Sequence, residues 1–63
     1  MAITLKAARI NAGYTQEQVC EALNLGKSTL QNYESYETVP RIDVAKNLAE
    51  FYGMTVDDII WRG

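Results

Sequence analysis

The stretch Thr15–Glu34, TQEQVCEALNLGKSTLQNYE, contains two short amphipathic segments joined by a turn that includes a glycine. The first segment opens with the clearest helix signal in the chain, because Thr15 and Gln18 have the spacing of a capping box. This spacing predicts a helix that ends near Leu23. A tight connection follows, and a second helix is expected over about Lys27–Tyr36.

The second of these helices has an unusual polar face. Leu30 and Tyr33, three residues apart, are expected to anchor the helix to the core. The opposite side carries four polar residues at i, i+1, i+4 and i+5, namely Lys27, Ser28, Gln31 and Asn32. A polar helix face is often only solvated. Such a face usually carries Glu and Lys pairs, however, whereas this one consists mostly of amide and hydroxyl groups that are less favourable for helix formation.

Two short helices joined by a turn with a glycine form the helix-turn-helix pattern. In this pattern the first helix crosses the DNA backbone and the second lies in the major groove. Lysine suits the O6 and N7 acceptors of guanine, asparagine and glutamine suit adenine, and serine is permissive. The polar face therefore predicts contacts with base edges, and a merely solvated face is the alternative.

The remaining sequence predicts three more helices. One is expected over about Thr4–Asn11, stopped by Gly13 in the manner of a C-cap. Another follows Pro40 and runs to about Tyr52. Its inward face is expected to consist of Ile42, Ala45, Leu48, Ala49 and Tyr52. A last short helix opens at Thr55 and carries Val56, Ile59 and Ile60. The expected fold is all-α, with five helices in a single domain over residues 1–63.

The composition argues against an enzyme and against a metal protein. The chain has no histidine, so acid–base catalysis would depend on carboxylates, and a zinc site would lack its usual ligands. Cys20 has no second cysteine and no candidate base, which makes it a core residue rather than a nucleophile. No apolar run approaches the roughly 20 residues that span a bilayer. We expect a cytoplasmic binding module that needs no cofactor and no small-molecule ligand.

From Leu5 to Ile60 the sequence resembles the Cro/repressor-type (XRE-like) helix-turn-helix family of phage and bacterial regulators. The resemblance rests on several motifs in the right order and spacing. They are LKAAR in the first helix, TQEQV at the start of the second, STLQNYE in the third, and the closing run PRIDVAKNLAEFYGMTVDDII. It implies a lambda-repressor-like domain that binds double-stranded DNA and regulates transcription, with the helix-turn-helix formed by helices 2 and 3.

The same resemblance implies roles for individual residues. Contacts with base edges are expected from Lys27, Ser28, Gln31 and Asn32. Contacts with phosphates are expected from Lys6, Thr15, Gln16 and Arg41, and Gln16 would also brace the third helix. Arg9 and Glu34 match a family pair that forms a largely buried salt bridge. A DNA contact is the alternative for Arg9, but a charge amid the apolar residues of the first helix needs a partner if it is buried.

Three positions depart from the family pattern. The family usually has glycine where this chain has Asn24, and serine or threonine where it has Gly26, which can cap a helix only without a side-chain oxygen. Ser28 and Gln31 could form a capping box of their own, which would start the third helix two residues later and make Lys27 a phosphate contact. The glycine common near Ser35-Tyr36 is also absent, so the loop to Pro40 is expected to contain more helix or to bend differently.

The charge of the chain bears on its partners. Eight acidic residues against six basic ones give a net charge of −2, whereas DNA-binding domains are commonly basic. Few cations would be free to meet phosphates, so affinity per monomer should be weak, and we expect a homodimer on an operator of two half-sites. The candidate dimer contacts are Ile59, Ile60 and Trp61, and for Trp61 a place in the core is the alternative.

Two other functions fit the sequence. The chain could be a helical protein–protein interaction module that kept the fold while its acidic surface meets a partner protein. It could also be the DNA-binding fragment of a longer repressor or antitoxin. With no sensor or catalytic segment after Ile59-Ile60-Trp61, the expectation is a minimal, Cro-like regulator.

Overall fold

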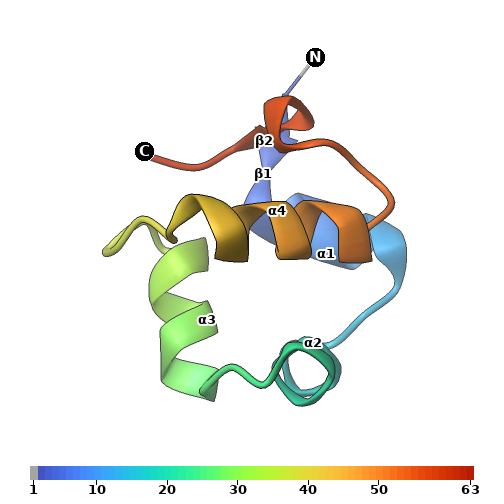
Figure 1. Cartoon of the computed structure of the whole chain (residues 1–63), viewed down its shortest axis with the longest axis vertical. Coiled ribbons are helices and arrows are strands. Elements are labelled where there is room, and N and C mark those ends of the chain that lie inside the picture. Colours follow the sequence, from blue (N-terminus) through green and yellow to red (C-terminus); the bar gives the residue numbers. More distant parts are fainter. Residues whose placement is uncertain (1) are drawn as a thin grey trace.

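A computed structural model describes residues 2–63. Its α-helices are α1 (Leu5–Ala12), α2 (Gln16–Leu23), α3 (Lys27–Glu34) and α4 (Ile42–Phe51). They are accompanied by strand β1 (Ile3–Thr4), the 3-10 helix η1 (Val56–Asp58) and strand β2 (Ile59–Ile60). Figure 1 shows α2 and α3 at one end of the molecule, the two strands at the other end, and α1 and α4 between them. The turn between α2 and α3 thus lies at the end of the molecule opposite the two strands.

Local side-chain signals set the ends of the first two helices. The Thr4 hydroxyl accepts a hydrogen bond from the Ala7 N–H (3.1 Å) at the start of α1, and Gly13, at φ 85°, ends that helix in the left-handed conformation. The predicted capping box of α2 is confirmed. Thr15 Oγ1 accepts from the Gln18 N–H (3.1 Å), and Gln18 Oε1 accepts from the Thr15 N–H (2.8 Å).

The turn and α3 differ from the expectation at one end only. Asn24 ends α2 at φ 56°, a conformation that asparagine tolerates better than most residues, so the usual glycine is not required. Gly26 caps α3 without a side-chain bond, and the helix begins at Lys27 rather than two residues later. It ends at Glu34, before the predicted end at Tyr36, because Tyr36 itself adopts a positive φ of 65°.

The Tyr36 hydroxyl links this bend to the start of α1 and to β2. It donates to the Ile60 carbonyl (2.9 Å) and accepts from the Leu5 N–H (3.4 Å). A left-handed conformation is unfavourable for a tyrosine, and it persists where surrounding contacts impose it. The loop after α3 is therefore held by the strand region, without the glycine that the family pattern has near this place.

The prediction of a fifth α-helix is wrong: the described residues contain four. After Thr55 the chain makes only the single 3-10 turn of η1, and Ile59 then takes extended angles (φ −121°, ψ 139°). β2 pairs with β1 in parallel, Ile3 opposite Ile59 and Thr4 opposite Ile60. Consecutive β-branched residues suit a strand better than a helix, and a partner strand at the other end of the chain satisfies their backbone groups.

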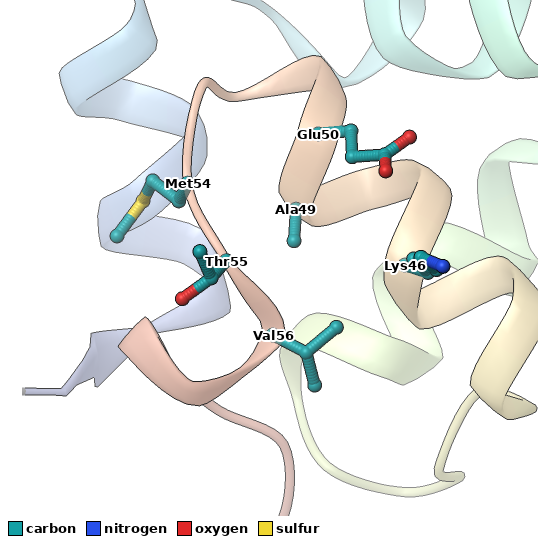
Figure 2. Close-up of a pocket in the computed structure, with 6 residues that line it drawn as sticks. All are labelled: Lys46, Ala49, Glu50, Met54, Thr55 and Val56. Carbon is teal, nitrogen blue, oxygen red and sulfur yellow. The ribbon is translucent and has the colours of Figure 1, made fainter.

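A pocket lies between α4 and η1. Figure 2 shows Lys46 and Glu50 at one side of it, on α4, and Val56 at the other. The pocket is lined by Lys46, Ala49, Glu50, Met54, Thr55 and Val56. None of these residues was predicted to contact DNA.

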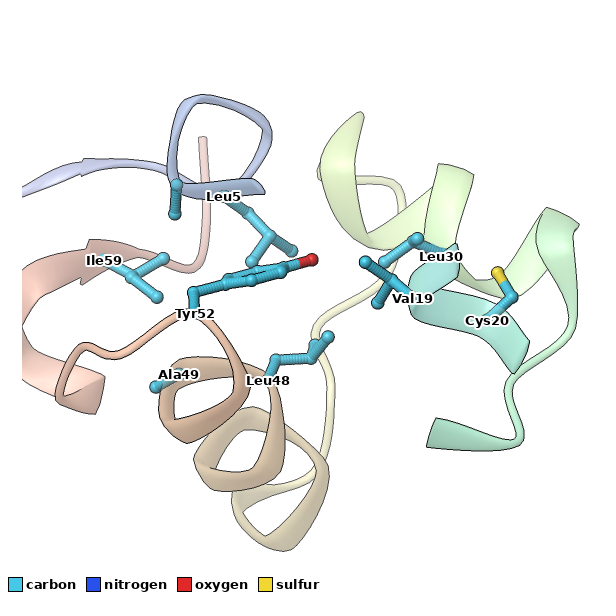
Figure 3. Close-up of a cluster of buried hydrophobic side chains, with 9 residues drawn as sticks. Leu5, Val19, Cys20, Leu30, Leu48, Ala49, Tyr52 and Ile59 are labelled. Atoms are coloured by element: carbon cyan, nitrogen blue, oxygen red, sulfur yellow. The ribbon is translucent and has the colours of Figure 1, made fainter. Parts of the chain in front are cut away.

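The core is built from all four helices and β2. Its largest fully buried side chains are Leu5 of α1, Val19 of α2, Leu30 of α3 and Leu48 of α4. Figure 3 shows the ring of Tyr52 between Leu5 and Leu48, with its hydroxyl pointing toward the helix-turn-helix pair. One residue of the predicted inward face of α4 is misassigned. Ile42, the first residue of α4, is 73% exposed and lies outside the core, whereas Ala45, three residues later, is buried.

The helices of residues 2–63 do not include one with the length and apolar character needed to cross a membrane.

Candidate nucleic-acid interface

The structure brings the four predicted base-contacting residues to the exposed side of α3. Leu30 of the same helix is fully buried, and Tyr33 packs against the core. All four polar side chains are exposed, namely Lys27, Ser28, Gln31 and Asn32. Because α3 begins at Lys27, Lys27 and Ser28 lie in its first turn. They occupy the end of the helix that reaches base edges in a helix-turn-helix complex.

A buried ion pair fixes the inner side of α3. Arg9 Nε lies 2.8 Å from Glu34 Oε2, and Arg9 Nη2 donates to Glu34 Oε1 at 3.4 Å. The Arg9 and Glu34 side chains are 11% and 5% exposed, and Arg9 Nη1 also donates to the Tyr14 carbonyl (2.9 Å). One guanidinium thus joins α1, α3 and the segment before α2. These contacts occupy the Arg9 side chain and support a structural role over a DNA contact.

Gln16 links this buried pair to the exposed side of α3. Its Nε2 donates to Glu34 Oε1 (3.0 Å), and its Oε1 accepts from Gln31 Nε2 at the longer distance of 3.5 Å. The expected bracing of the third helix is therefore present geometrically. The partner of Gln16 on the inner side, Glu34, was not predicted, because no sequence spacing relates residues on helices that cross.

Two polar hollows open on either side of Gln16. One is lined by Arg9, Thr15, Gln16, Glu17 and Lys27. The other is lined by Lys6, Gln16, Gln31, Glu34 and Ser35. Three of the four predicted phosphate contacts thus gather around the start of α2, where free backbone N–H groups and the helix dipole favour anions. The fourth, Arg41, lies apart from both hollows, as the exposed residue that precedes α4.

One charged contact at this surface has no signal in the sequence. Lys27 Nζ lies 3.7 Å from Glu17 Oε1, and the two side chains are 57% and 79% exposed. Glu17 is in the first turn of α2, where an acidic residue is favoured by the helix dipole. Its pairing with Lys27 depends on how α2 and α3 cross, so no local pattern could have revealed it.

The cysteine beside this region is a core residue. Cys20 is 8% exposed, and its Sγ lies 3.6 Å from the Gly26 carbonyl, to which the thiol can donate. Burial raises the pKa of the Cys20 thiol above its usual value, which keeps it protonated and unreactive.

The three predicted dimer contacts have different surroundings. Ile59 is 4% exposed and belongs to the core, so its prediction as a contact with a second copy needs correction. Trp61 is half-buried against the core, and its indole N–H donates to the Val56 carbonyl (2.9 Å). This is the alternative that placed Trp61 in the core. Ile60 remains exposed, at 38%.

Comparisons with known proteins agree with the geometry. A family model described as helix-turn-helix matches residues 5–59. The chain is 39% identical over 58 residues to the HTH-type transcriptional regulator ImmR of Bacillus subtilis, a match that covers 92% of this chain and 46% of ImmR. It is 27% identical over 56 residues to the cryptic phage CTXphi transcriptional repressor RstR of Vibrio cholerae, covering 89% of this chain and 50% of RstR.

A third relative is the HTH-type transcriptional activator BcrR of Enterococcus faecalis, 27% identical over 56 residues, with 89% of this chain and 28% of BcrR covered. The chain thus spans half or less of the length of these relatives. No solved structure gives a significant match. The resemblance to Cro/repressor-type regulators is confirmed.

Proposed function

Because this chain belongs to the helix-turn-helix family, we propose that it binds duplex DNA sequence-specifically as a small Cro/repressor-type regulator of transcription, with α3 in the major groove. The observation that carries the proposal is the exposed outer side of α3. Its hydroxyl and amide groups are held on a helix whose inner side is anchored by the Arg9–Glu34 pair.

The base contacts follow from the chemistry of this surface. Lys27 donates to guanine, Gln31 and Asn32 form paired hydrogen bonds with adenine, and Ser28 adapts to either. Gln31 is steadied by Gln16, and Gln16 by the buried Glu34. The side chains of α3 therefore meet the groove from a supported position, which lowers the conformational entropy lost on binding.

Phosphate contacts set the position of the domain on the duplex. We assign them to Lys6, Thr15 and Gln16 around the start of α2, and to Arg41 before α4. The Thr15 hydroxyl oxygen already accepts the capping hydrogen bond of α2, but its hydrogen remains available to a phosphate oxygen. Such contacts carry no sequence information, and they fix the register in which α3 meets the bases.

We propose that DNA is bound by a homodimer of this domain. One domain measures 27 × 23 × 19 Å, whereas half-sites in helix-turn-helix operators lie about 34 Å apart. One copy therefore cannot occupy both half-sites, and the net charge of −2 gives a single copy few phosphate contacts. Ile60, with the exposed edge of Trp61, is the candidate contact between copies.

Two observations favour other candidates. The exposed apolar side chains of Val39 (49%) and Ile42 (73%) favour a helical module that binds a partner protein. The partial coverage of the relatives favours residues 1–63 being the DNA-binding part of a longer regulator.

Selection from a pool of random duplexes, at one stated salt concentration, tests the proposal. A sequence-specific binder enriches one motif and binds it about 10³-fold or more tighter than a scrambled duplex. Equal binding to selected and scrambled duplexes, or enrichment of no motif, would contradict the proposal and favour the protein-binding module.

A further inference from the structure

We propose that Glu17 is a positioning residue that competes with DNA for the ammonium group of Lys27. This inference rests on the proposed function, in which Lys27 contacts DNA. In the free domain the Glu17 carboxylate holds Lys27 at 3.7 Å and must release it before the ammonium can reach a base or a phosphate. Glu17 would therefore lower the affinity of the domain for DNA.

The geometry of the pair indicates that Glu17 competes with DNA for Lys27 only weakly. Both residues line the same hollow between α2 and α3, together with Gln16. Both side chains are also more than half exposed, so their attraction is weak and salt screens it. The pair therefore reduces DNA affinity without preventing binding, and its influence should fade as salt concentration rises.

The position of Lys27 makes the competition consequential. Lys27 is the sole lysine or arginine between Thr15 and Glu34, so it supplies the only positive side-chain charge of the helix-turn-helix segment. Arg9, the other cation lining the hollow, is committed to Glu34. When Glu17 pairs with Lys27, the acidic domain therefore has no free side-chain cation at the start of α3.

The test compares four variants on the selected duplex and on a scrambled one, across a salt series. Glu17→Gln removes the competing charge and keeps the size of the side chain. Glu50→Gln is the matched control, because it makes the same change of net charge at the pocket between α4 and η1, away from the α2–α3 hollows. Lys27→Met and the double variant Glu17→Gln/Lys27→Met show whether the effect passes through Lys27.

We expect Glu17→Gln to bind about threefold to fivefold tighter at 0.1 M salt, which is the upper value of an exposed ion pair. Its salt slope should be steeper by up to about 0.9 per protomer, the value of one further positive charge placed against the duplex. Glu50→Gln should stay within twofold of the parent. In the Lys27→Met background the gain from Glu17→Gln should fall below twofold. Melting of each variant, followed by circular dichroism, verifies that the compared proteins are folded.

The inference is overturned if Glu17→Gln binds within twofold of the parent, or if its gain persists undiminished in the Lys27→Met background. A parent that binds selected and scrambled duplexes equally contradicts the proposed function. In that case the scrambled duplex still decides the role of Glu17, because the positive charge of Lys27 is attracted to the phosphate backbone of any duplex, whatever its sequence. A chain that binds no duplex in any variant overturns both.

Discussion

The inner and outer sides of α3 differ in burial and in the contacts that their side chains make. On the inner side Leu30 is fully buried, and the Glu34 carboxylate, 5% exposed in its side chain, accepts hydrogen bonds from Arg9 and Gln16. On the outer side Ser28 and Asn32 are exposed to solvent. Exposed hydroxyl and amide groups add little to helix stability. Contacts on the inner side therefore hold the helix in place. Residues on the outer side contribute little to stability, so their identity can suit a binding partner.

This difference implies that stability and DNA affinity depend on separate sets of residues of one helix. Substitutions on the inner side should reduce the free energy of unfolding, whereas substitutions on the outer side should change DNA binding and leave unfolding nearly unaltered. Gln16 joins the two sides, so the separation is least complete at that residue.

The largest effect is expected on the inner side, from Glu34→Gln. The variant leaves the buried Arg9 guanidinium without a countercharge, and breaking one partner of a buried pair typically costs about 3–5 kcal/mol. For a domain of this size, that loss lowers the melting temperature by roughly 15 °C or more. Thermal unfolding followed by circular dichroism measures the change.

The control is Glu37→Gln, the same substitution at an exposed position just after α3. Its melting temperature should lie within about 3 °C of the parent, as for most surface substitutions. If both variants melt alike, the ion pair of the inner side does not hold α3, and the contrast between the two sides disappears.

On the outer side, Asn32→Ala should cost binding rather than stability. Losing one well-formed contact with a base costs about 1–3 kcal/mol of affinity for the selected duplex and relaxes the preference at one base pair.

Arg41→Ala, before α4, should instead weaken binding to selected and scrambled duplexes alike, and reduce the salt slope by roughly one per protomer. Titrations of both duplexes across a salt series distinguish the two outcomes.

An unchanged ratio of selected to scrambled affinity in Asn32→Ala would mean that the outer side is merely solvated. A selective loss in Arg41→Ala would move that residue from the phosphates to the bases.

The sequence predicted best what depends on neighbours along the chain. The capping box of Thr15 and Gln18 joins residues three apart, and the stop at Gly13 depends on one residue's backbone freedom, so both were visible without a structure. The polar outer side of α3 was likewise visible from helical spacing. These signals located the first four helices to within one or two residues at each end.

What the sequence could not predict depends on distant partners. The spacing of Val56, Ile59 and Ile60 suits a helix, but the chain becomes a strand there because Ile3–Thr4 lies alongside. The links from Gln16 to Glu34 and from Glu17 to Lys27 follow from the crossing of α2 and α3. Such contacts are set by packing rather than by local pattern.

A smaller effect is expected where α2 begins, next to both sides of α3. Thr15→Ala removes the hydroxyl that caps the Gln18 N–H, and losing such a cap costs about 1 kcal/mol of stability. Thr38→Ala, at an exposed loop position after α3, serves as the control and should cost less than about 0.5 kcal/mol. Urea denaturation measures both. Equal losses would show that the cap does not stabilise α2.

The smallest effect at neutral pH is expected from Tyr52→Phe, which tests the one buried polar side-chain atom left without a partner among the described residues. The Tyr52 hydroxyl is buried beside the partnered inner side of α3 and makes no hydrogen bond. Removing it relieves an unsatisfied group, so stability at pH 7 should stay level or rise by up to about 1 kcal/mol.

The same substitution should change how stability depends on pH. Burial is the main cause that raises the pKa of Tyr52 above its ordinary value of 10.0, and the negative charge of Glu34 raises it further. Above about pH 10 the unfolded chain therefore releases this proton while the folded domain keeps it, and the parent loses stability as pH rises. The phenylalanine variant lacks this loss, so its advantage in urea denaturation should grow from pH 8 to pH 11. An advantage that stays constant over that range would mean that Tyr52 ionises as easily in the folded domain as in the unfolded chain, and that its side of the core is open to water.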